Sequence, residues 1–263
     1  MNKEINGGVV FTHEQVKEYS TIELVGQYLL AAHLINSKLS ERRDKISTLV
    51  DFGSGAGKST RAIAPSVRAG GRIIGVDISD EFVSEARIIT GKSTPRQDIE
   101  FDYRKINIVN GREVIPLDDQ SVDAVTSTIV LQELQTEAQL RGALSEMGRI
   151  AKTGAHLALV CVSDKIVRDD FTAFTYAPFP ENAGRDDNIR KCLSTVSNIV
   201  WENDRHWSSE ALMSGLKAGG WGNLKAEYPL ATEEMRPFPS RPELGWKDEV
   251  RVAPLVLISG CRL

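Results

Sequence analysis

The stretch "VDFGSGAGKST" at residues 50–60 constrains the fold most, because three glycines on alternate positions follow a short β-rich run and precede a helical pattern. Glycine at such a junction lets the backbone turn sharply and lie against a ligand without a clash from a Cβ atom. The stretch therefore predicts a strand, a ligand-binding loop and a helix. Its spacing decides between three kinds of ligand.

The tail "GSGAGKST" is close to the phosphate-binding loop of nucleotide hydrolases, which requires G-x-x-x-x-G-K-[ST]. Phe52 stands where that pattern has its first glycine. Asp51 would also place a carboxylate beside a loop that has to cradle phosphates. A P-loop-like nucleotide-binding protein is therefore kept as an alternative from another class.

The dinucleotide-binding loop, G-x-G-x-x-G, also differs from this stretch. Its third glycine would fall one position later than Gly57. Asp77, at the end of the second β-rich run, would suit ribose hydroxyls in this case as in others. The early glycine and Asp51 together disfavour a nicotinamide cofactor.

The order D-x-G-x-G-x-G, counted from Asp51, resembles motif I of the class I S-adenosylmethionine-dependent methyltransferases. Four later stretches resemble further motifs of that family in the family's order: "IIGVDIS", "SVDAVTSTIVLQEL", "MGRIAKTGAHLALV" and "SSEALMSGLKAGGW". The resemblance covers most of residues 46–263. It implies methyl transfer from S-adenosyl-L-methionine, with S-adenosyl-L-homocysteine as the product.

The resemblance also implies roles for individual residues. The acid of motif I, here Asp51, helps to organise the methionine moiety, and the acid of the second motif, here Asp77, holds the ribose hydroxyls. The family's adenine-contacting acid is replaced, with Asn107 as its nearest counterpart, and Lys58 becomes part of a solvated first helical turn. The implied cofactor contacts are Asp51, Gly53, Ser54, Gly55, Gly57, Asp77, Ile78, Asn107, Ile108, Thr128 and Ile129.

Short β-rich runs alternate with helical patterns along most of the chain, which predicts a parallel sheet with helices on both faces. We expect an α/β fold: a doubly wound, mostly parallel seven-stranded sheet with an antiparallel last strand and an N-terminal helical lid. The expected strands are 46–52, 72–79, 99–107, 121–131, 155–163, 223–230 and 252–263, and the expected helices include 13–39, 59–70, 80–92 and 208–221.

A single domain over residues 1–263 is expected. It divides into an N-terminal helical lid (1–45), a cofactor-binding core (46–163), a substrate-recognition insertion (164–206) and a C-terminal helix with edge strands (207–263). The insertion has an irregular pattern for which we expect no regular strand.

Methyl transfer from a sulfonium is an in-line displacement, so alignment of the reactants supplies much of the rate. A base is needed only when the acceptor must lose a proton. Glu133, after the fourth strand, is a candidate base or a carboxylate at a helix start, and His206 and His13 are further catalytic candidates. For His206 a surface position is the alternative. Candidate substrate contacts, with core packing as the alternative for the aromatic ones, are Tyr19, Gln132, Phe171, Phe174, Tyr176 and Trp201.

The amino-acid composition narrows the class of molecule that could accept the methyl group. A net charge of −4 and a pI near 5.7 argue against a protein whose main task is to bind nucleic acid backbones. We therefore expect a small-molecule acceptor, a metabolite or natural-product intermediate of biosynthesis, and no nucleic acid partner. An RNA or protein acceptor remains the alternative.

The start of the chain lacks the apolar run of a signal peptide, and the longest apolar runs are too short to span a bilayer, so no membrane partner is expected. Three scattered cysteines without a CxxC pair predict neither a disulfide framework nor a zinc site, and they favour a reducing cytoplasm. No metal is expected. A homo-oligomer is left open.

Overall fold

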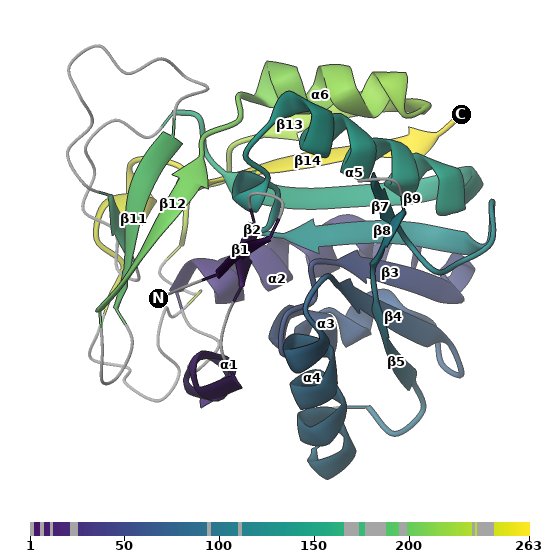
Figure 1. The fold of residues 1–263 in the computed structure, drawn as a ribbon. Coiled ribbons are helices and arrows are strands. Elements are labelled where there is room, and N and C mark those ends of the chain that lie inside the picture. The colour runs from purple at the N-terminus through teal and green to yellow at the C-terminus, as the bar shows by residue number, and fades with distance from the viewer. Residues whose placement is uncertain are drawn as a thin grey trace.

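The structure, a computed structural model, centres on a seven-stranded sheet whose order can be followed in Figure 1 as β13-β14-β9-β8-β3-β4-β5. It describes the chain except residues 1–2, 6–7, 11–12, 22–25, 94–95, 110–111, 166–173, 177–187, 195–198, 233–234 and 236–244. The strands of the sheet are β3 (Thr48–Phe52), β4 (Arg72–Asp77), β5 (Glu100–Lys105), β8 (Val122–Thr128), β9 (Ala151–Val162), β13 (Trp221–Glu227) and β14 (Leu255–Arg262).

Five neighbouring strands, β9 to β5 in this order, pair in parallel, and β14 runs antiparallel to both β9 and β13. The predicted α/β fold with a mostly parallel seven-stranded sheet is therefore confirmed. The chain leaves β3 toward β4 on one side and later returns to place β8 on its other side. Ligands of open α/β sheets bind outside the carboxyl ends of the strands at such a reversal.

Alternate residues of the central strands face two apolar layers. Val50 and Ile74 belong to the layer beneath α5 (Glu137–Ile150) and α6 (Ser209–Ala218). Leu49 and Ile73 belong to the layer beneath α2 (Gly26–Ser40). Because side chains alternate across a strand, runs that are apolar throughout fit a sheet covered on both faces.

The helices begin where the sequence supplies caps. Ser79 caps α4 (Asp80–Lys92) and Ser208 caps α6, each by accepting a backbone N–H with its side chain. Thr136 and Gln139 form a capping box at the start of α5. Such caps satisfy backbone donors that have no partner inside the helix.

Two helix predictions were wrong in extent. The expected helix 13–39 is two helices, α1 (His13–Thr21) and α2, and α2 begins at Gly26 with a left-handed φ of 55°. The expected helix 59–70 is a short α3 (Lys58–Ala62) followed by a 3-10 turn, η2 (Ala64–Ser66). Pro65 explains the early end of α3, because proline has no N–H to donate and its ring crowds the preceding turn.

The insertion holds strands that the sequence did not reveal. β10 (Phe174–Tyr176), β11 (Asn188–Ser194) and β12 (Ile199–Arg205) form a three-stranded antiparallel sheet, which lies beside the main sheet in Figure 1. Charged and apolar residues are mixed along these strands, so the period of two that indicates a half-buried strand is weak. The expectation of no regular strand in 164–206 was therefore wrong.

Small hairpins accompany the main sheet: β1 (Lys3–Ile5) with β2 (Gly8–Val10), and β6 (Asn107–Val109) with β7 (Arg112–Val114). The third predicted strand, 99–107, thus ends at Lys105. Short 3-10 turns also occur at η1 (Arg43–Lys45) and η4 (Asp248–Val250).

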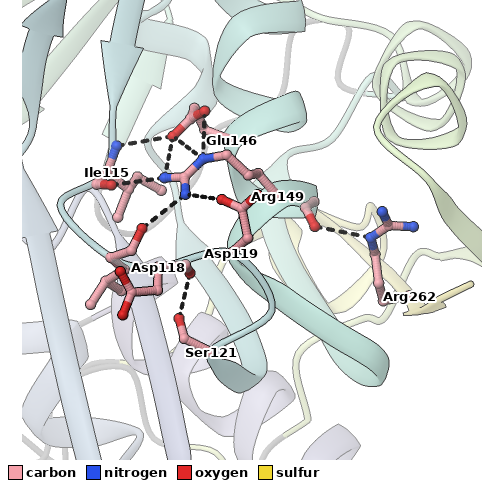
Figure 2. Close-up of polar contacts among 9 residues, drawn as sticks. Ile115, Asp118, Asp119, Ser121, Glu146, Arg149 and Arg262 are labelled. Carbon is pink, nitrogen blue, oxygen red and sulfur yellow. Dashed lines mark hydrogen bonds and ion pairs between the residues drawn. The ribbon is translucent and has the colours of Figure 1, made fainter.

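Arg149, at the end of α5, binds the segment of residues 115–119 that precedes β8, as Figure 2 shows. Arg149 donates from Nη2 to Ile115 O at 2.8 Å and from Nη1 to Leu117 O at 2.8 Å. The same guanidinium pairs with Glu146 and with Asp119 Oδ1, at 2.8 and 2.7 Å. The loop that leads into β8 is thereby tied to α5, which fixes the strand that ends at Thr128.

Candidate active site

The loop after β3 is shaped by its three glycines. Gly53, Gly55 and Gly57 all have left-handed backbones, with φ values of 72°, 50° and 78°. A Cβ at Gly53 would lie 2.3 Å from Val130 Cγ1, and one at Gly57 would lie 2.5 Å from Tyr103 Oη. At Gly55 a Cβ would meet nothing within 4 Å, so this residue faces open space. At Gly55 the loop therefore presents only backbone atoms to a ligand, and we call residues 53–57 the three-glycine cradle.

Asp77 ends β4 beside this loop. Its Oδ2 accepts the N–H of Gly55 at 2.8 Å, and its Oδ1 accepts the N–H of Ser79 at 3.0 Å. Burial raises the pKa of Asp77, although these backbone bonds act in the opposite direction. Each carboxylate oxygen has a second acceptor position, so two donors of a ligand could still be bound.

Apolar side chains flank Asp77 at the same edge of the sheet. Ile78 is 44% exposed and Ile108 is 42% exposed, and β4 and β5 are paired neighbours there, with Asp77 opposite Lys105. Asn107 is exposed at the start of β6. The edge thus offers a carboxylate with apolar groups beside it.

Asp51 lies beneath the loop and is fully buried. Its Oδ2 accepts the hydroxyls of Ser59 and Thr60 at 3.0 and 2.8 Å, and its Oδ1 accepts that of Thr126 at 3.1 Å. Burial raises the pKa of Asp51 to about 6, and the three hydroxyls oppose the rise. These bonds join β3, α3 and β8 under the loop, so a role of Asp51 toward a methionine moiety stays a prediction.

Two buried hydroxyls at the ends of β3 and β8 have no hydrogen-bond partner: Ser54 Oγ and Thr128 Oγ1. The strands are paired here, with Phe52 opposite Ser127. A buried polar group without a partner costs on the order of 1–3 kcal/mol. These two groups could be satisfied by a polar ligand in the cradle.

Ile129 follows Thr128 with a φ of 54°, in a region that β-branched residues rarely adopt. Its N–H donates to Val160 O at 2.8 Å. Backbone strain of this kind costs about 1–3 kcal/mol and is concentrated at functional sites. The chain therefore turns away sharply at the end of β8.

The three catalytic candidates lie in different settings. Glu133 belongs to the single turn of a 3-10 helix, η3 (Leu131–Glu133), and is partly exposed; α5 begins later, at Glu137. His206 is buried, not on the surface, with Nε2 3.0 Å from Ser163 O. His13 is exposed at the start of α1.

Two of the predicted substrate contacts have described side chains. Gln132 is buried in η3; its Nε2 donates to Ile129 O at 2.8 Å, and its Oε1 has no partner. Tyr19 is partly buried and donates from Oη to Tyr28 Oη at 3.2 Å. Phe171 lies outside the described residues, and so do the side chains of Phe174, Tyr176 and Trp201.

Lys58 is not the solvated lysine that we expected. Its Nζ donates to Tyr19 O at 2.6 Å and lies 5.2 Å from the centre of the Tyr19 ring. The lysine of the apparent phosphate loop is thus directed at α1.

Arg205 and Trp207, one at the end of the insertion sheet and one just after it, bind the segment that follows η3. At the end of β12, Arg205 donates to Gln135 O at 3.2 Å and stacks on Trp207, 4.6 Å from the ring centre. Trp207 donates to Leu134 O at 3.0 Å. The sequence signal is only a short polar and aromatic cluster, "NDRHW", before a helix cap.

Among the described residues, no three histidines, cysteines or acids are grouped so that they could hold a metal ion. Within the same described part of the chain, every helix is too short or too polar to cross a membrane.

The comparisons with known proteins agree with this geometry. Residues 50–159 match the family model described as a methyltransferase domain. A solved S-adenosylmethionine-dependent methyltransferase from Aquifex aeolicus has a TM-score of 0.55 at 18% identity, over 97% of this chain and 100% of that chain. At this identity the likeness shows a shared fold.

Two curated relatives match shorter stretches. An arsenite methyltransferase of Halobacterium salinarum is 29% identical over 153 residues, 58% of this chain and 34% of that protein. An uncharacterized 37.1 kDa protein in transposon TN4556 of Streptomyces fradiae is 32% identical over 110 residues, 42% of this chain and 28% of that protein. The chain thus spans about a third or less of the length of these relatives.

The family match and the fold point to the same class of protein. Residues 50–159 match the methyltransferase domain, and the chain shares the fold of a solved S-adenosylmethionine-dependent methyltransferase. This match and this fold support the predicted enzyme class and the predicted cofactor, S-adenosyl-L-methionine.

Proposed function

We propose that this protein transfers a methyl group from S-adenosyl-L-methionine to a small-molecule acceptor. The observation that carries the proposal is the pairing of the three-glycine cradle with Asp77 at the carboxyl edge of the sheet. Asp77 already holds the loop through Gly55 N–H and retains acceptor positions on both oxygens. This arrangement suits a ligand with neighbouring hydroxyls and a moiety that lies along bare backbone.

The described residues fit that cofactor. The ribose hydroxyls would bind Asp77, the adenine would lie against Ile78 and Ile108 near Asn107, and the methionine moiety would lie along Gly53 to Gly57. The orphaned hydroxyls of Ser54 and Thr128 would gain partners. When bound, the cofactor supplies a methyl group on a positively charged sulfur.

The protein's own contribution to the reaction is to position the acceptor in line with the methyl group. Reactants held in line gain about 7–11 kcal/mol over the same reactants free in solution. We propose that α1, as a lid, and the insertion sheet cover the carboxyl edge of the sheet, exclude water and hold the acceptor beside η3. Glu133, at the end of η3, would take a proton from an acceptor that must lose one.

The described cysteines do not favour the acceptor named for the Halobacterium relative. Soft metal and metalloid ions prefer thiolate ligands. Burial raises the pKa of Cys161 to about 12, so this group stays a thiol. Cys161 lies opposite Val256 and Cys261 lies opposite His156 on the paired strands β9 and β14, so the two sulfurs are far apart. Arsenite is therefore not the acceptor that we propose.

A small-molecule acceptor is supported by the net charge of −4 and by the aromatic residues of the insertion, and a cytoplasmic setting is supported by the three scattered cysteines. An RNA or protein acceptor is the alternative within the class. A radiolabelled methyl donor distinguishes the two classes of acceptor. Label in small molecules supports the proposal, whereas label in the RNA or protein fraction supports the alternative.

The test of the proposal is calorimetric titration with S-adenosyl-L-homocysteine, with ATP and NADH as controls. We expect binding of S-adenosyl-L-homocysteine alone. Asp77→Ala should weaken it by about 2 kcal/mol, because charge-assisted hydrogen bonds to ribose are lost. Asp98→Ala, which changes an exposed carboxylate bound to Arg96, is the matched control and should bind normally. Binding of ATP instead, or an unchanged affinity in Asp77→Ala, would contradict the assignment.

A further inference from the structure

We propose that Lys58 is a positioning residue that fastens α1 onto the cofactor loop and so holds the lid closed over the proposed site. The proposal rests on the proposed function for its meaning, but the contact itself can be tested without any ligand.

The first support is where the lysine donates. Lys58 begins α3, directly after Gly57, and its Nζ lies 2.6 Å from Tyr19 O. Tyr19 is in the last turn of α1, which ends at Thr21. Carbonyls in the last turn of a helix lack intrahelical donors, and the helix dipole favours a cation there. Lys58 thus caps α1 from a different part of the chain.

The second support is that α1 also packs on the loop itself. Val16 is fully buried in a cluster with Ala56 and Phe82, and Ala56 is the loop residue between Gly55 and Gly57. Tyr19 packs edge-on against Phe82 at 5.6 Å between ring centres. The cap and the contact with Ala56 therefore both join α1 to residues 56–58, and Phe82 adds a contact with α4.

The third support is the setting of the ammonium group. Burial, and then the charge of Arg61, lower the pKa of Lys58 to about 7. The contacts with the Tyr19 carbonyl and ring therefore offset only part of the cost of burying the charge, and near pH 7 the amine donates to Tyr19 O in both its charged and its neutral form. The geometry of these contacts is incompatible with a side chain that reaches out toward a phosphate group.

Removal of the cap should open α1 more often without unfolding the sheet. If only the closed form binds the cofactor well, the apparent dissociation constant rises as the closed fraction falls. Loss of one hydrogen bond from a largely buried donor predicts about a tenfold increase in opening.

Hydrogen exchange of the ligand-free protein, read by mass spectrometry, tests the contact. In Lys58→Met we expect residues 13–21 to exchange about tenfold faster, and residues 26–40 and 72–92 to exchange as in the wild type. Lys58→Arg, which keeps a cationic donor, should restore part of the protection. Lys92→Met, a change at an exposed lysine of α4, is the matched control and should exchange normally.

Two results would overturn the proposal: unchanged exchange of residues 13–21 in Lys58→Met, or faster exchange throughout the sheet, which would mark a general structural role. Titration with S-adenosyl-L-homocysteine follows, and Lys58→Met should bind several-fold more weakly. Failure of the wild type to bind would refute the proposed function, whereas the exchange result on the free protein would stand.

Discussion

Replacement of Asp51 by asparagine is expected to stabilise this protein at neutral pH. The Asp51 carboxylate is fully buried, and its pKa of about 6 lies well above the ordinary value of 3.8. A shift of that size corresponds to about 3 kcal/mol of free energy that the ionised form costs the fold. Asparagine has no charge to bury but forms weaker bonds with the hydroxyls of Ser59, Thr60 and Thr126. The expected net gain is about 1–2 kcal/mol at pH 7.

The gain should depend on pH in a definite direction. Between about pH 4 and pH 6 the folded wild type retains a proton on Asp51 that the unfolded chain has lost. Its free energy of unfolding therefore falls as the pH rises through this window, by up to about 3 kcal/mol from this group. Asp51→Asn lacks this term, so the difference between variant and wild type should grow from pH 4 to pH 7.

Urea unfolding of both proteins at several pH values measures the difference directly. Asp123→Asn serves as a control of opposite sign. Burial alone would raise the pKa of Asp123, but Lys152 and the backbone N–H groups of Thr48 and Ser47 hold it below its usual range. That variant should be less stable at pH 7, and its deficit should shrink as the pH falls. A difference for Asp51→Asn that is independent of pH would refute the reasoning.

Two further changes test the packing around the site. Gly53→Ala should lower the free energy of unfolding by about 3 kcal/mol, because φ is 72° and the new Cβ would lie 2.3 Å from Val130 Cγ1. Val130→Ala in the same chain should recover part of the loss, and no recovery would argue against the clash. Arg149→Met should cost about 3 kcal/mol, because Ile115 O and Leu117 O lose their donor and Glu146 its cation. Glu146→Gln added to Arg149→Met should cost less than Glu146→Gln alone; strict additivity in urea unfolding would contradict a shared network.

The main sheet was predictable because its signals are local. Runs such as "IIGV" at residues 73–76 are apolar throughout, as strands covered on both faces must be, and serine or threonine caps stand at the starts of α4, α5 and α6. The insertion sheet was not predictable, because β11 and β12 are held together by pairing between strands whose own sequences are mixed. Pairing partners are a tertiary choice, and pattern within one strand carries little information about them.

For the candidate site, the sequence located the loop but not the orientation of its neighbours. The spacing of Gly53, Gly55 and Gly57 was informative because each residue adopts a backbone that other residues avoid. The direction of the Lys58 side chain was not predictable, because a lysine in the sequence "GKST" can face a phosphate, solvent or the end of a helix. Only the arrival of α1 above the loop decides that Nζ meets Tyr19 O.

The sequence by itself determined the parallel sheet, its cradle of glycines and the acid that follows the second strand of the predicted core, because these depend on backbone conformation and short-range pattern. The tertiary structure alone decided that Asp51 is buried among three hydroxyls, that His206 bonds the carbonyl of Ser163, and that Lys58 caps another helix. The burial of a side chain and its hydrogen-bond partners depend on segments that are distant in the chain. They determine its protonation and its orientation, which its identity in the sequence does not specify.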